Sequence, residues 1–542
     1  MSEFTAEEKE ILKRFFTSIN SDTFCLVNLP EVVKGSLFSR YSRSAKSVRR
    51  LFLDEFYNGE IGGMFKNESR VTSHESGVNS KKAEEFYERV LVGYGDDSVA
   101  ELGGVHIATE NISCVLAKLL EDARVGISPL EKSSRYVFFD KKVNNKYTYY
   151  REPAIMKSRF AKEYEKMLDM LFDTYSHIVR EMYELLVSEP KPSEAISDIA
   201  YKASCRAKAC DVARYLLPMA AHRNVGLYGN GRAFEYLLIK LAASPLEEAR
   251  TVSLAMHKEL SKVIPAFVHR AYNERGVKFA QYLKDTVGSM EGYGVTKEIK
   301  RLPKNVGNEL TLFEAEKEAL DKVVTALLFP HSNISWERLF LKVKALSEKR
   351  KTGILEQATR RRENRHHKAL RGFEQINYSF EIVSDIGAFY DLQRHRVLTQ
   401  YHESYTTLLG FNVPVELNAF PKLKKLYIDA MERVDGLYRK IARTMPHEAQ
   451  YVVPMGYRIR YMMRMNLREA IHLTELRSGP QGHSSYRYLA QEIAKAIVKK
   501  HPLVGKYAFK FVDYNSYKLE RLAAFQKIAE KAGKMGIKAF EE

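Results

Sequence analysis

The sequence predicts an α+β fold, mostly helical, in which one domain occurs twice in tandem. Three observations support this prediction: a strand followed by a helix occurs twice, a proline-containing segment followed by Asn-x-Arg occurs twice, and helical runs separate these units. A chain of 542 residues is also too long for one ordinary hydrophobic core. We therefore expect domains at residues 1–289 and 372–542, with a linker and a basic helical insertion at residues 290–371.

The first repeated unit is a strand followed by a helix. In the later copy, the residues that alternate as in a half-buried strand are Ile376, Tyr378, Phe380 and Ile382. In the earlier copy they are Val105, Ile107 and Thr109. We expect Ser384 or Asp385 to cap the later helix and Asn111 to cap the earlier one, because these side chains can accept a hydrogen bond from a helix N-terminus.

The second repeated unit lies downstream in each half and keeps one spacing. Residues 213–219 match residues 449–455, with Pro218 and Pro454 at the same position. Asn230-x-Arg232 follows Pro218 at the distance at which Asn466-x-Arg468 follows Pro454, so both pairs are 236 positions apart. We expect each half to contain a helix interrupted by proline and then a turn to an Asn-x-Arg helix start. The common register indicates an internal duplication.

Helical patterns at residues 159–186 and 429–443 fill the spaces between the repeated units. The first thirty residues predict an acidic amphipathic helix and a loop, and residues 37–43 predict a strand that leads into a basic helix. The basic run between residues 349 and 365 carries charge on all sides, so its ordinary interpretation is a solvated helix. The more specific alternative is that this run contacts nucleic acid or another subunit.

The composition limits the partners and the compartment. The 86 Lys+Arg against 68 Asp+Glu give a net charge of +18, which favours anionic partners. The 4 cysteines are too few and too irregular for a disulfide framework or a zinc site, as is typical of a reduced cytoplasmic protein. No leader and no long uncharged apolar run is present, so we expect neither secretion nor membrane spanning.

A basic triplet, Arg394-His395-Arg396, follows the later strand and helix, and Ser404 comes after seven further residues. Arginine offers a rigid fork of donors and always carries charge, so the triplet suits a phosphate or an electron-rich ring. For a bare triplet, a solvated surface patch is the ordinary interpretation. After the earlier strand and helix stands Asp122-Ala123-Arg124, and Ser133 comes after eight further residues.

The triplet, seven residues and serine resemble the signature of the flavin-dependent thymidylate synthases. Phe373-Glu374 resembles that family's Phe-Glu-His. Residues 466–470, followed by Leu476-Arg477, resemble its Asn-x-Arg-Ser-Leu and Leu-Arg motifs. Three motifs in one order and spacing are far more specific than a lone motif. The chain thus resembles two tandem copies of this family's domain.

The resemblance implies reductive methylation of the uracil C5 of dUMP to dTMP, with methylenetetrahydrofolate as one-carbon donor, NADPH as reductant and FAD as cofactor. Classical enzymes for this reaction use a cysteine nucleophile, and no cysteine here is near a basic cluster in the sequence. The catalytic candidates by resemblance are Arg394, Arg477 and Ser133, and no metal site is expected. The family forms homotetramers of single domains, so the matching assembly is a homodimer of this duplicated chain.

In the family, the nucleotide pocket takes one set of residues from one subunit and a second set from another. The first set corresponds to Arg394 and Arg477, in the later copy. The second set corresponds to residues of the earlier copy, namely Glu131, Ser133, Ser134, Arg135 and Arg214. The positions of a reciprocal pocket have lost these groups and carry Asp122, Leu241, Thr406, Thr407 and Gln450. We therefore expect one composite nucleotide pocket per chain.

By the same resemblance, the flavin contacts are His395, Arg396, Asn466 and Arg468, with Glu374, Glu101, Asn230 and Arg232 as further candidates. Two positions depart from the family: Asp391 stands where it usually has Gln, and Gln481 where it usually has His. An aspartate near a phosphate repels it, so a substrate other than free dUMP stays open.

Two other classes of function also stay open. A flavoprotein that binds nucleic acid and modifies a base would make use of the net charge and the basic insertion, although nucleic acid is not the favoured partner. A non-catalytic nucleotide-binding scaffold is the other alternative. Steep salt dependence of nucleic-acid binding would favour the former, and absence of bound flavin the latter.

Overall fold

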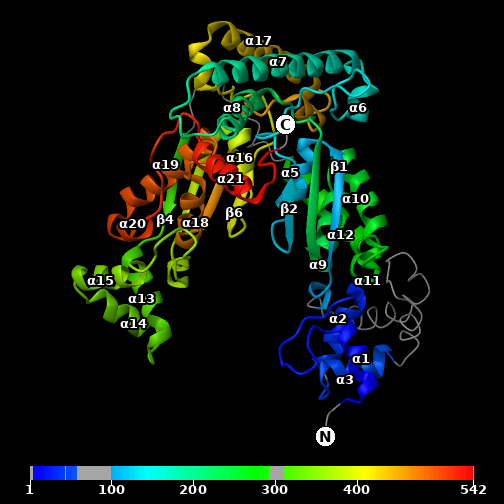
Figure 1. The fold of residues 1–542 in the computed structure, drawn as a ribbon, viewed down its shortest axis with the longest axis vertical. Coiled ribbons are helices and arrows are strands. Elements are labelled where there is room, and N and C mark those ends of the chain that lie inside the picture. Colours follow the sequence, from blue (N-terminus) through cyan, green and yellow to red (C-terminus); the bar gives the residue numbers. More distant parts are fainter. Residues whose placement is uncertain (1–3, 43, 58–98, 292–308, 541–542) are drawn as a thin grey trace. The chain divides into compact units, whose positions relative to one another are not determined.

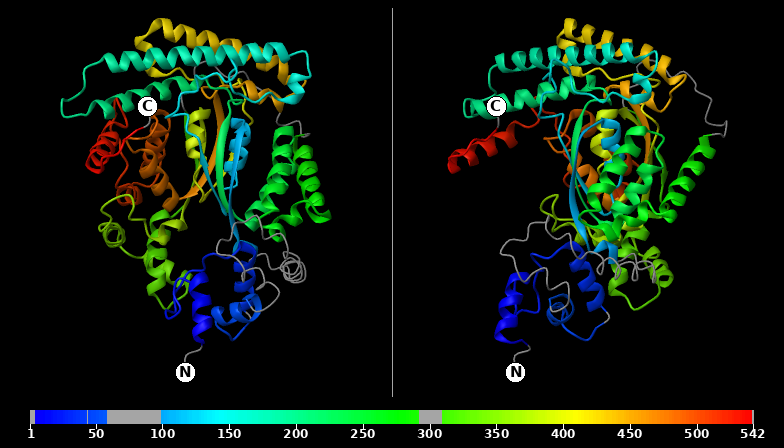
Figure 2. Two further views of the ribbon diagram at one scale, coloured as in Figure 1. Left: turned by 45° about the vertical axis from the view of Figure 1, so that its right-hand side comes forward. Right: turned by 90° about the vertical axis from the view of Figure 1, so that its right-hand side faces the viewer.

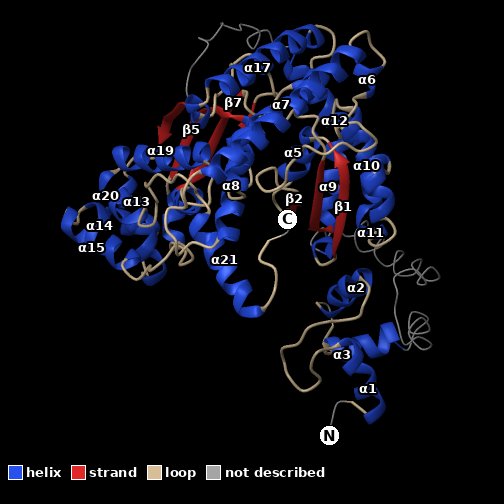
Figure 3. Ribbon diagram, turned by 45° about the horizontal axis from the view of Figure 1, so that its top comes forward, coloured by secondary structure: helices blue, strands red, loops and turns tan. Residues whose placement is uncertain are grey.

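The computed structural model describes residues 4–42, 44–57, 99–291 and 309–540 (Figure 1). Contacts divide the chain into two compact units. The first unit comprises Met1–Glu110, Leu119–Glu131 and Asn224–Glu298, and the second Asn111–Lys118, Lys132–Arg223 and Ile299–Glu542. Helices predominate over two small sheets (Figure 3), so the fold is α+β and mostly helical, as the sequence predicts.

The first unit contains a three-stranded sheet in the order β1-β3-β2. Its strands are β1 (Gly104–Ile112), β2 (Ile127–Glu131) and β3 (Arg223–Asn230). The helix α5 (Cys114–Asp122) connects β1 to β2, and β3 continues into α9 (Gly231–Ala242), α10 (Glu247–Leu260), α11 (Pro265–Val268) and α12 (Glu274–Glu291). Ahead of the sheet, α1 (Ala6–Phe15), α2 (Glu31–Tyr41) and α3 (Val48–Leu51) share a hydrophobic cluster.

The second unit contains a four-stranded antiparallel sheet in the order β4-β5-β7-β6. Its strands are β4 (Glu309–Ala315), β5 (Asn377–Asp385), β6 (Leu398–His402) and β7 (Arg458–Asn466). The helices of this unit that position the site are α7 (Ala161–Ser188), α8 (Asp198–Ala213), α16 (Ile386–Leu392), α17 (Pro421–Ala442), α18 (Leu467–Arg477) and α19 (Ser484–Lys500). The long helices α7 and α17 lie side by side (Figure 2).

The remaining helices of the second unit lie before α7, in the segment between the copies, and in the C-terminal tail. They are α6 (Pro153–Met156), α13 (Ala319–Leu328), α14 (Trp336–Lys344), α15 (Glu348–Thr359), α20 (Pro502–Ala508) and α21 (Leu522–Met535). The strand β4 lies within residues 290–371, expected to be linker and insertion, yet it pairs with β5. None of the described helices is long and apolar enough to cross a bilayer.

The two halves repeat one order of elements. In each, a strand, a helix, a short strand and a long helix precede a further strand that runs into an Asn-capped helix. The short strands pair in one register: Ile127 lies opposite Gly229, and Leu398 opposite Met465. The caps agree as well, because Asn230 accepts from the amide of Ala233 and Asn466 from that of Glu469, both at 2.9 Å. The chain therefore contains two tandem copies of one domain.

Within the second unit, the copies meet at the repeated prolines. Pro218 and Pro454 form an antiparallel bridge. On one side Met219 donates its amide to Val453 at 2.8 Å, and on the other Met455 donates to Leu217 at 3.0 Å. Met219 and Met455 are equivalent positions of the two copies, and so are Leu217 and Val453, so the two hydrogen bonds are equivalent as well. This arrangement is expected at a two-fold axis between duplicated segments.

The structure corrects four local predictions. The expected turn before each Asn-x-Arg is a strand, β3 or β7. Residues 37–41 belong to α2 and not to a strand, and residue 43 lies outside the described residues. Ser113, not Asn111, caps α5, because its Oγ accepts from the amide of Leu116 at 3.0 Å. In the basic run, Lys349, Arg350, Arg360 and Arg361 are exposed, as predicted for a solvated helix, but Lys351 and Arg362 are buried in ion pairs with Asp321 and Glu475.

Candidate functional site

Four elements of the second unit bring arginines from both copies to one carboxylate. Arg135 lies in the segment after β2, and Arg214 begins the 3-10 turn Arg214–Leu216 at the end of α8. Arg477 ends α18, and Asp391 lies in the last turn of α16. The cap of α16, in which Asp385 accepts from the amide of Ala388 at 2.7 Å, fixes where that helix starts.

Asp391 is the centre of this arginine cluster, which we define as Arg135, Arg214, Arg394, Arg477 and Asp391. Its carboxylate oxygens lie 3.7 Å from Nη2 of Arg214 and 3.7 Å from Nη1 of Arg477. Burial works against ionisation, but the charges of Arg135, Arg214, Arg477 and Arg394 outweigh it and lower the pKa of Asp391 below its ordinary value. The cluster thus joins both sets of arginines expected to bind the nucleotide.

The orientation of Arg135 is fixed by a further aspartate, Asp211, which is buried. Its Nε and Nη2 donate to the two oxygens of Asp211 at 2.9 and 3.0 Å, and its Nη1 donates to the hydroxyl of Tyr486 at 2.8 Å. Arg521 donates to the same aspartate at 2.9 Å. Although burial opposes ionisation, Arg135 and Arg521 hold the pKa of Asp211 well below its usual range. These bonds fix the orientation of Arg135.

Arg214 keeps donors available. Its side chain is 3% exposed, and its Nε and Nη2 have no hydrogen-bond partner among the described residues. Gly387 makes room for it, because a Cβ at that position would lie 2.7 Å from Nη2 of Arg214. A buried guanidinium with unused donors is costly unless a ligand accepts from it. The arrangement therefore indicates an anion-binding position beside Asp391.

A cavity of about 460 Å³ is lined by Asp211, the carboxylate that binds Arg135 of the cluster. Its lining includes Asp211, Tyr215, Asn412, Arg458 and His483. Arg458 donates to Asn412 at 2.7 Å, and His483 contacts the carbonyl of Asp211 at 3.2 Å. Burial, reinforced by Arg214, lowers the pKa of His483 to about 3, so this imidazole is neutral at neutral pH. The walls are mostly apolar with a few polar groups, so the cavity suits a small ligand that carries both kinds of surface.

On the other side of the cluster, Arg477 is bonded to His395 of the basic triplet. Its Nε donates to Nε2 of His395 at 3.0 Å, and Nδ1 of His395 lies 2.7 Å from Oε1 of Glu469. His395 and Glu469 are 4% and 7% exposed. These hydrogen bonds connect Arg477, at the end of α18, through His395 to Glu469 at the start of the same helix.

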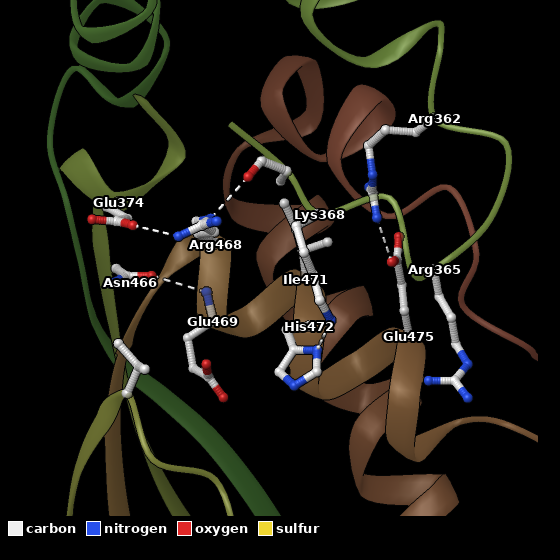
Figure 4. Close-up of a pocket in the computed structure, with 12 residues that line it drawn as sticks. Arg362, Arg365, Lys368, Glu374, Asn466, Arg468, Glu469, Ile471, His472 and Glu475 are labelled. Carbon is white, nitrogen blue, oxygen red and sulfur yellow. Dashed lines mark hydrogen bonds and ion pairs between the residues drawn. The ribbon is translucent and has the colours of Figure 1, made fainter. Parts of the chain in front are cut away.

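Glu469 also lines a cavity of about 210 Å³ that the Asn-x-Arg start of α18 borders (Figure 4). Arg468 donates to Glu374 at 2.7 Å and to the carbonyl of Ala369 at 2.8 Å. Lys368 lies 3.1 Å from Nδ1 of His472. Residues 362–369, at the end of the basic run, thus form one wall of this cavity, so part of the expected insertion has a place at the site.

The first unit contains the corresponding cavity of the earlier copy, of about 550 Å³. Arg232 donates to Glu101 at 2.7 Å, as Arg468 does to Glu374 in the later copy. Asn230 caps α9 beside this pair. Of the residues expected to contact the flavin, Glu374, Asn466 and Arg468 line the cavity of the later copy and Glu101, Asn230 and Arg232 that of the earlier copy, whereas His395 and Arg396 line neither. Only the later copy has the arginine of the Leu-Arg motif.

The other predicted residues lie as follows. The hydroxyl of Ser133 accepts from the amide of Arg135 at 3.2 Å, and Ser134 is buried. Glu131 ends β2 in the first unit, opposite Val225. Arg396 is exposed. Gln481 presents its backbone carbonyl to Arg135 at 3.3 Å.

The residues at the positions of a reciprocal pocket make contacts with neighbouring protein groups. Thr407 bonds to Asp435, and Gln450 accepts from the amide of Tyr405 at 3.1 Å. Thr406 accepts from the amide of Leu408. In the first unit, Leu241 is buried in the apolar face of α9, and Asp122 pairs with Lys240 at 3.5 Å. No arginine occupies these positions.

Sequence patterns alone did not identify Asp211, Tyr486, Arg521, His483 and Glu469 as part of the site. Asp211 had one detectable signal, since it is the only carboxylate in the otherwise apolar end of α8, residues 209–213. The other four lie in segments where charged and aromatic residues are common. Their roles follow from contacts between residues that are far apart in the chain.

The cysteines do not offer a nucleophile at this site. Burial raises the pKa of Cys205 to about 11 and that of Cys210 to about 12, so both stay protonated thiols at neutral pH. Cys114 is buried and Cys25 is exposed far along the chain from the motifs. Among the described residues, no His, Cys, Asp and Glu side chains are grouped as metal ligands.

Comparison with known proteins gives one family for both halves. A family model described as "Thymidylate synthase complementing protein" matches residues 60–266 and 311–503, which together make up most of the chain. One match in each half agrees with tandem copies. The second match begins inside residues 290–371, so the domain boundaries stay a prediction.

Similar proteins extend over nearly the whole chain. A UPF0159 protein of Chlamydia muridarum is 44% identical over 529 residues, which cover 96% of this chain and 97% of that protein. One of Chlamydia pneumoniae is 43% identical over 529 residues, with the same coverage. One of Thermoplasma acidophilum is 32% identical over 524 residues, which cover 92% of this chain and 99% of that protein.

Proposed function

The chain belongs to the thymidylate synthase complementing protein family, and on this premise we propose that it is a flavin-dependent thymidylate synthase-like enzyme. The proposed reaction methylates the uracil C5 of dUMP, with methylenetetrahydrofolate as one-carbon donor and NADPH as reductant. The observation that carries the proposal is the arginine cluster, in which Arg135 and Arg214 of one copy and Arg394 and Arg477 of the other act on Asp391.

The cluster supports a nucleotide as ligand. Guanidinium groups donate charge-assisted hydrogen bonds to phosphate and to the oxygens of a pyrimidine ring. Arg214 has unused donors for such a bond, and Asp211 fixes the orientation of the Arg135 guanidinium. Arg394, Arg477 and Ser133 are the proposed catalytic residues; the arginines would polarise the ring and stabilise the negative charge on its oxygens as C5 becomes nucleophilic, without a cysteine.

The cavity at the start of α18 supports a phosphate-bearing cofactor such as FAD. Asn466, Arg468 and Lys368 supply donors there, and its volume of about 210 Å³ is enough to enclose part of a dinucleotide. His395 and Arg396 are the further proposed contacts, and the cavity bordered by Arg232 is a second candidate position. When bound, the flavin would supply the electrons that reduce the transferred methylene group.

The purified protein tests this proposal. A bound flavin spectrum, together with conversion of dUMP to dTMP that needs methylenetetrahydrofolate and NADPH, is the expected result. Arg477→Ala should lower this conversion, while the exposed Arg250→Ala should leave it unchanged. Absence of both flavin and dTMP would reject the proposal. Tight, steeply salt-dependent nucleic-acid binding in their place would favour a polymer substrate.

We further propose that the chain assembles as a homodimer. This rests on the family resemblance, in which a tetramer of single domains would correspond to a dimer of the duplicated chain. Light scattering of the purified protein tests it: a mass of twice 62.4 kDa is expected, and a monomer would contradict it.

A further inference from the structure

Arg477 of the arginine cluster and two buried side chains, His395 and Glu469, form a chain to the cavity at the start of α18. Arg477 donates to His395, and His395 contacts Glu469. The Nε of arginine always carries a hydrogen, so Nε2 of His395 must accept. The neutral imidazole therefore has its proton on Nδ1 and donates it to Glu469 at 2.7 Å.

The earlier copy lacks all three members of this chain. Its positions equivalent to His395 and Arg477 are Ala123 and Leu241, and the register of the Asn-capped helices places Ala233 where the later copy has Glu469. The three groups are therefore present together in one copy and absent together in the other. This pattern is expected if they act as one unit.

We propose that Glu469 is a positioning residue for Arg477. By accepting the Nδ1 proton of His395, the carboxylate keeps the lone pair of Nε2 toward Arg477, and this bond holds the guanidinium where it faces Asp391. The inference rests on the proposed function only for the identity of the ligand. A buried histidine is generally oriented in this way by the partner of its other nitrogen.

Loss of the acceptor has a specific consequence. In Glu469→Ala, the Nδ1 proton of His395 loses its buried acceptor, so this tautomer loses one of its two stabilising bonds, and the alternative tautomer would point an N–H at the donor Nε of Arg477. Arg477 then loses its partner and its fixed orientation. Loss of the orienting partner of a metal-ligating histidine costs about 10- to 100-fold in metal affinity, and we expect a loss of similar size in ligand affinity here. Glu469→Gln keeps an acceptor oxygen and should retain most of the affinity.

The test combines dUMP titration with ¹⁵N NMR of histidine-labelled protein, in which His395→Ala identifies the His395 signals. We expect Glu469→Ala to bind dUMP at least about tenfold more weakly, and Glu469→Gln to stay within about threefold of the wild type. The wild type and Glu469→Gln should show a protonated Nδ1 and a bare Nε2 on His395, and Glu469→Ala should lose this signature. Glu163→Ala, at an exposed ion pair with Lys440, is the control.

The outcomes separate the inference from the proposed function. If the wild type binds no dUMP, the proposed function fails, and the His395 signals alone decide the role of Glu469. An unchanged tautomer in Glu469→Ala overturns the inference. If that variant is unstable, the double variant His395→Ala/Glu469→Ala is compared with His395→Ala: equal dUMP affinity supports action through His395, and a further loss overturns it.

Discussion

Arg214 and Asp391 lie 3.7 Å apart, although Arg214 belongs to the first copy of the duplicated domain and Asp391 to the second. The separation is too long for a hydrogen bond, so the carboxylate attracts the guanidinium without using its donors. Arg477 stands at the same distance from the other carboxylate oxygen. One aspartate therefore gathers arginines of both copies while leaving Arg214 able to bind an anion.

Arg214→Ala should weaken binding of dUMP by about tenfold or more. A charge-assisted hydrogen bond contributes about 1.5 to 3 kcal/mol, and 1.4 kcal/mol corresponds to a tenfold change in affinity. Isothermal titration measures the change. The matched control is Gln450→Ala, at the equivalent position of the other copy, which should bind as the wild type does. Equal losses in both variants would contradict a pocket confined to the arginine cluster.

Asp391→Asn should strengthen nucleotide binding and weaken the fold. The substitution removes a negative charge that faces the ligand, for which we expect about a tenfold gain in affinity. It also leaves the arginines without their shared counter-charge, at a cost of about 3 kcal/mol in the free energy of unfolding. Titration and chemical denaturation measure the two effects. Weaker dUMP binding by a folded Asp391→Asn protein would show that the carboxylate contacts the ligand directly.

The fold should lose stability as the pH falls from 7 to 4. Burial lowers the pKa of His483 to about 3 in the folded state, against about 6.5 when unfolded. Below pH 6.5 the unfolded chain binds a proton that the folded chain does not, so stability declines with falling pH, by about 3 kcal/mol for this residue. Denaturation at both pH values should show a smaller decline for His483→Gln. An identical decline would show that His483 takes up its proton without unfolding.

Arg468→Ala should release flavin, whereas Arg232→Ala in the other copy should retain it. Both arginines pair with a glutamate at 2.7 Å, but only the cavity beside Arg468 is linked by Glu469 and His395 to the arginine cluster. The ratio of bound flavin to protein, determined from the absorbance after gel filtration, measures how much cofactor each variant retains. Release by Arg232→Ala alone would place the cofactor in the first unit instead.

The duplication was visible in the sequence because proline and Asn-x-Arg keep one spacing in both halves. The strands β3 and β7 were not visible. β3 contains Gly226 and Gly229, which favour a turn, yet glycine is needed at position 229 because a Cβ there would lie 2.9 Å from Ile127 and 3.0 Å from Phe234. The local pattern of residues 37–43 predicts a strand, but residues 37–41 belong to α2, which packs against α1 and α3 in one hydrophobic cluster.

The arginines of the site could be named from motifs, but their environment could not. No pattern in the sequence shows that Asp211 fixes Arg135, or that Glu469 and His395 fix Arg477, because these partners meet only through the tertiary fold. The basic run was expected to be solvated, since charge alone does not reveal that Glu475 lies opposite Arg362. Buried ion pairs of this kind need a partner that is distant in the chain.

The central claim is that the two copies together provide one nucleotide site per chain. Titration of the purified, flavin-loaded protein with dUMP tests it most directly. We expect a stoichiometry of one dUMP per chain, with the affinity lowered about tenfold or more by Arg214→Ala from the first copy and likewise by Arg477→Ala from the second. Two equivalent sites per chain, or one site whose affinity either substitution leaves unchanged, would contradict the claim.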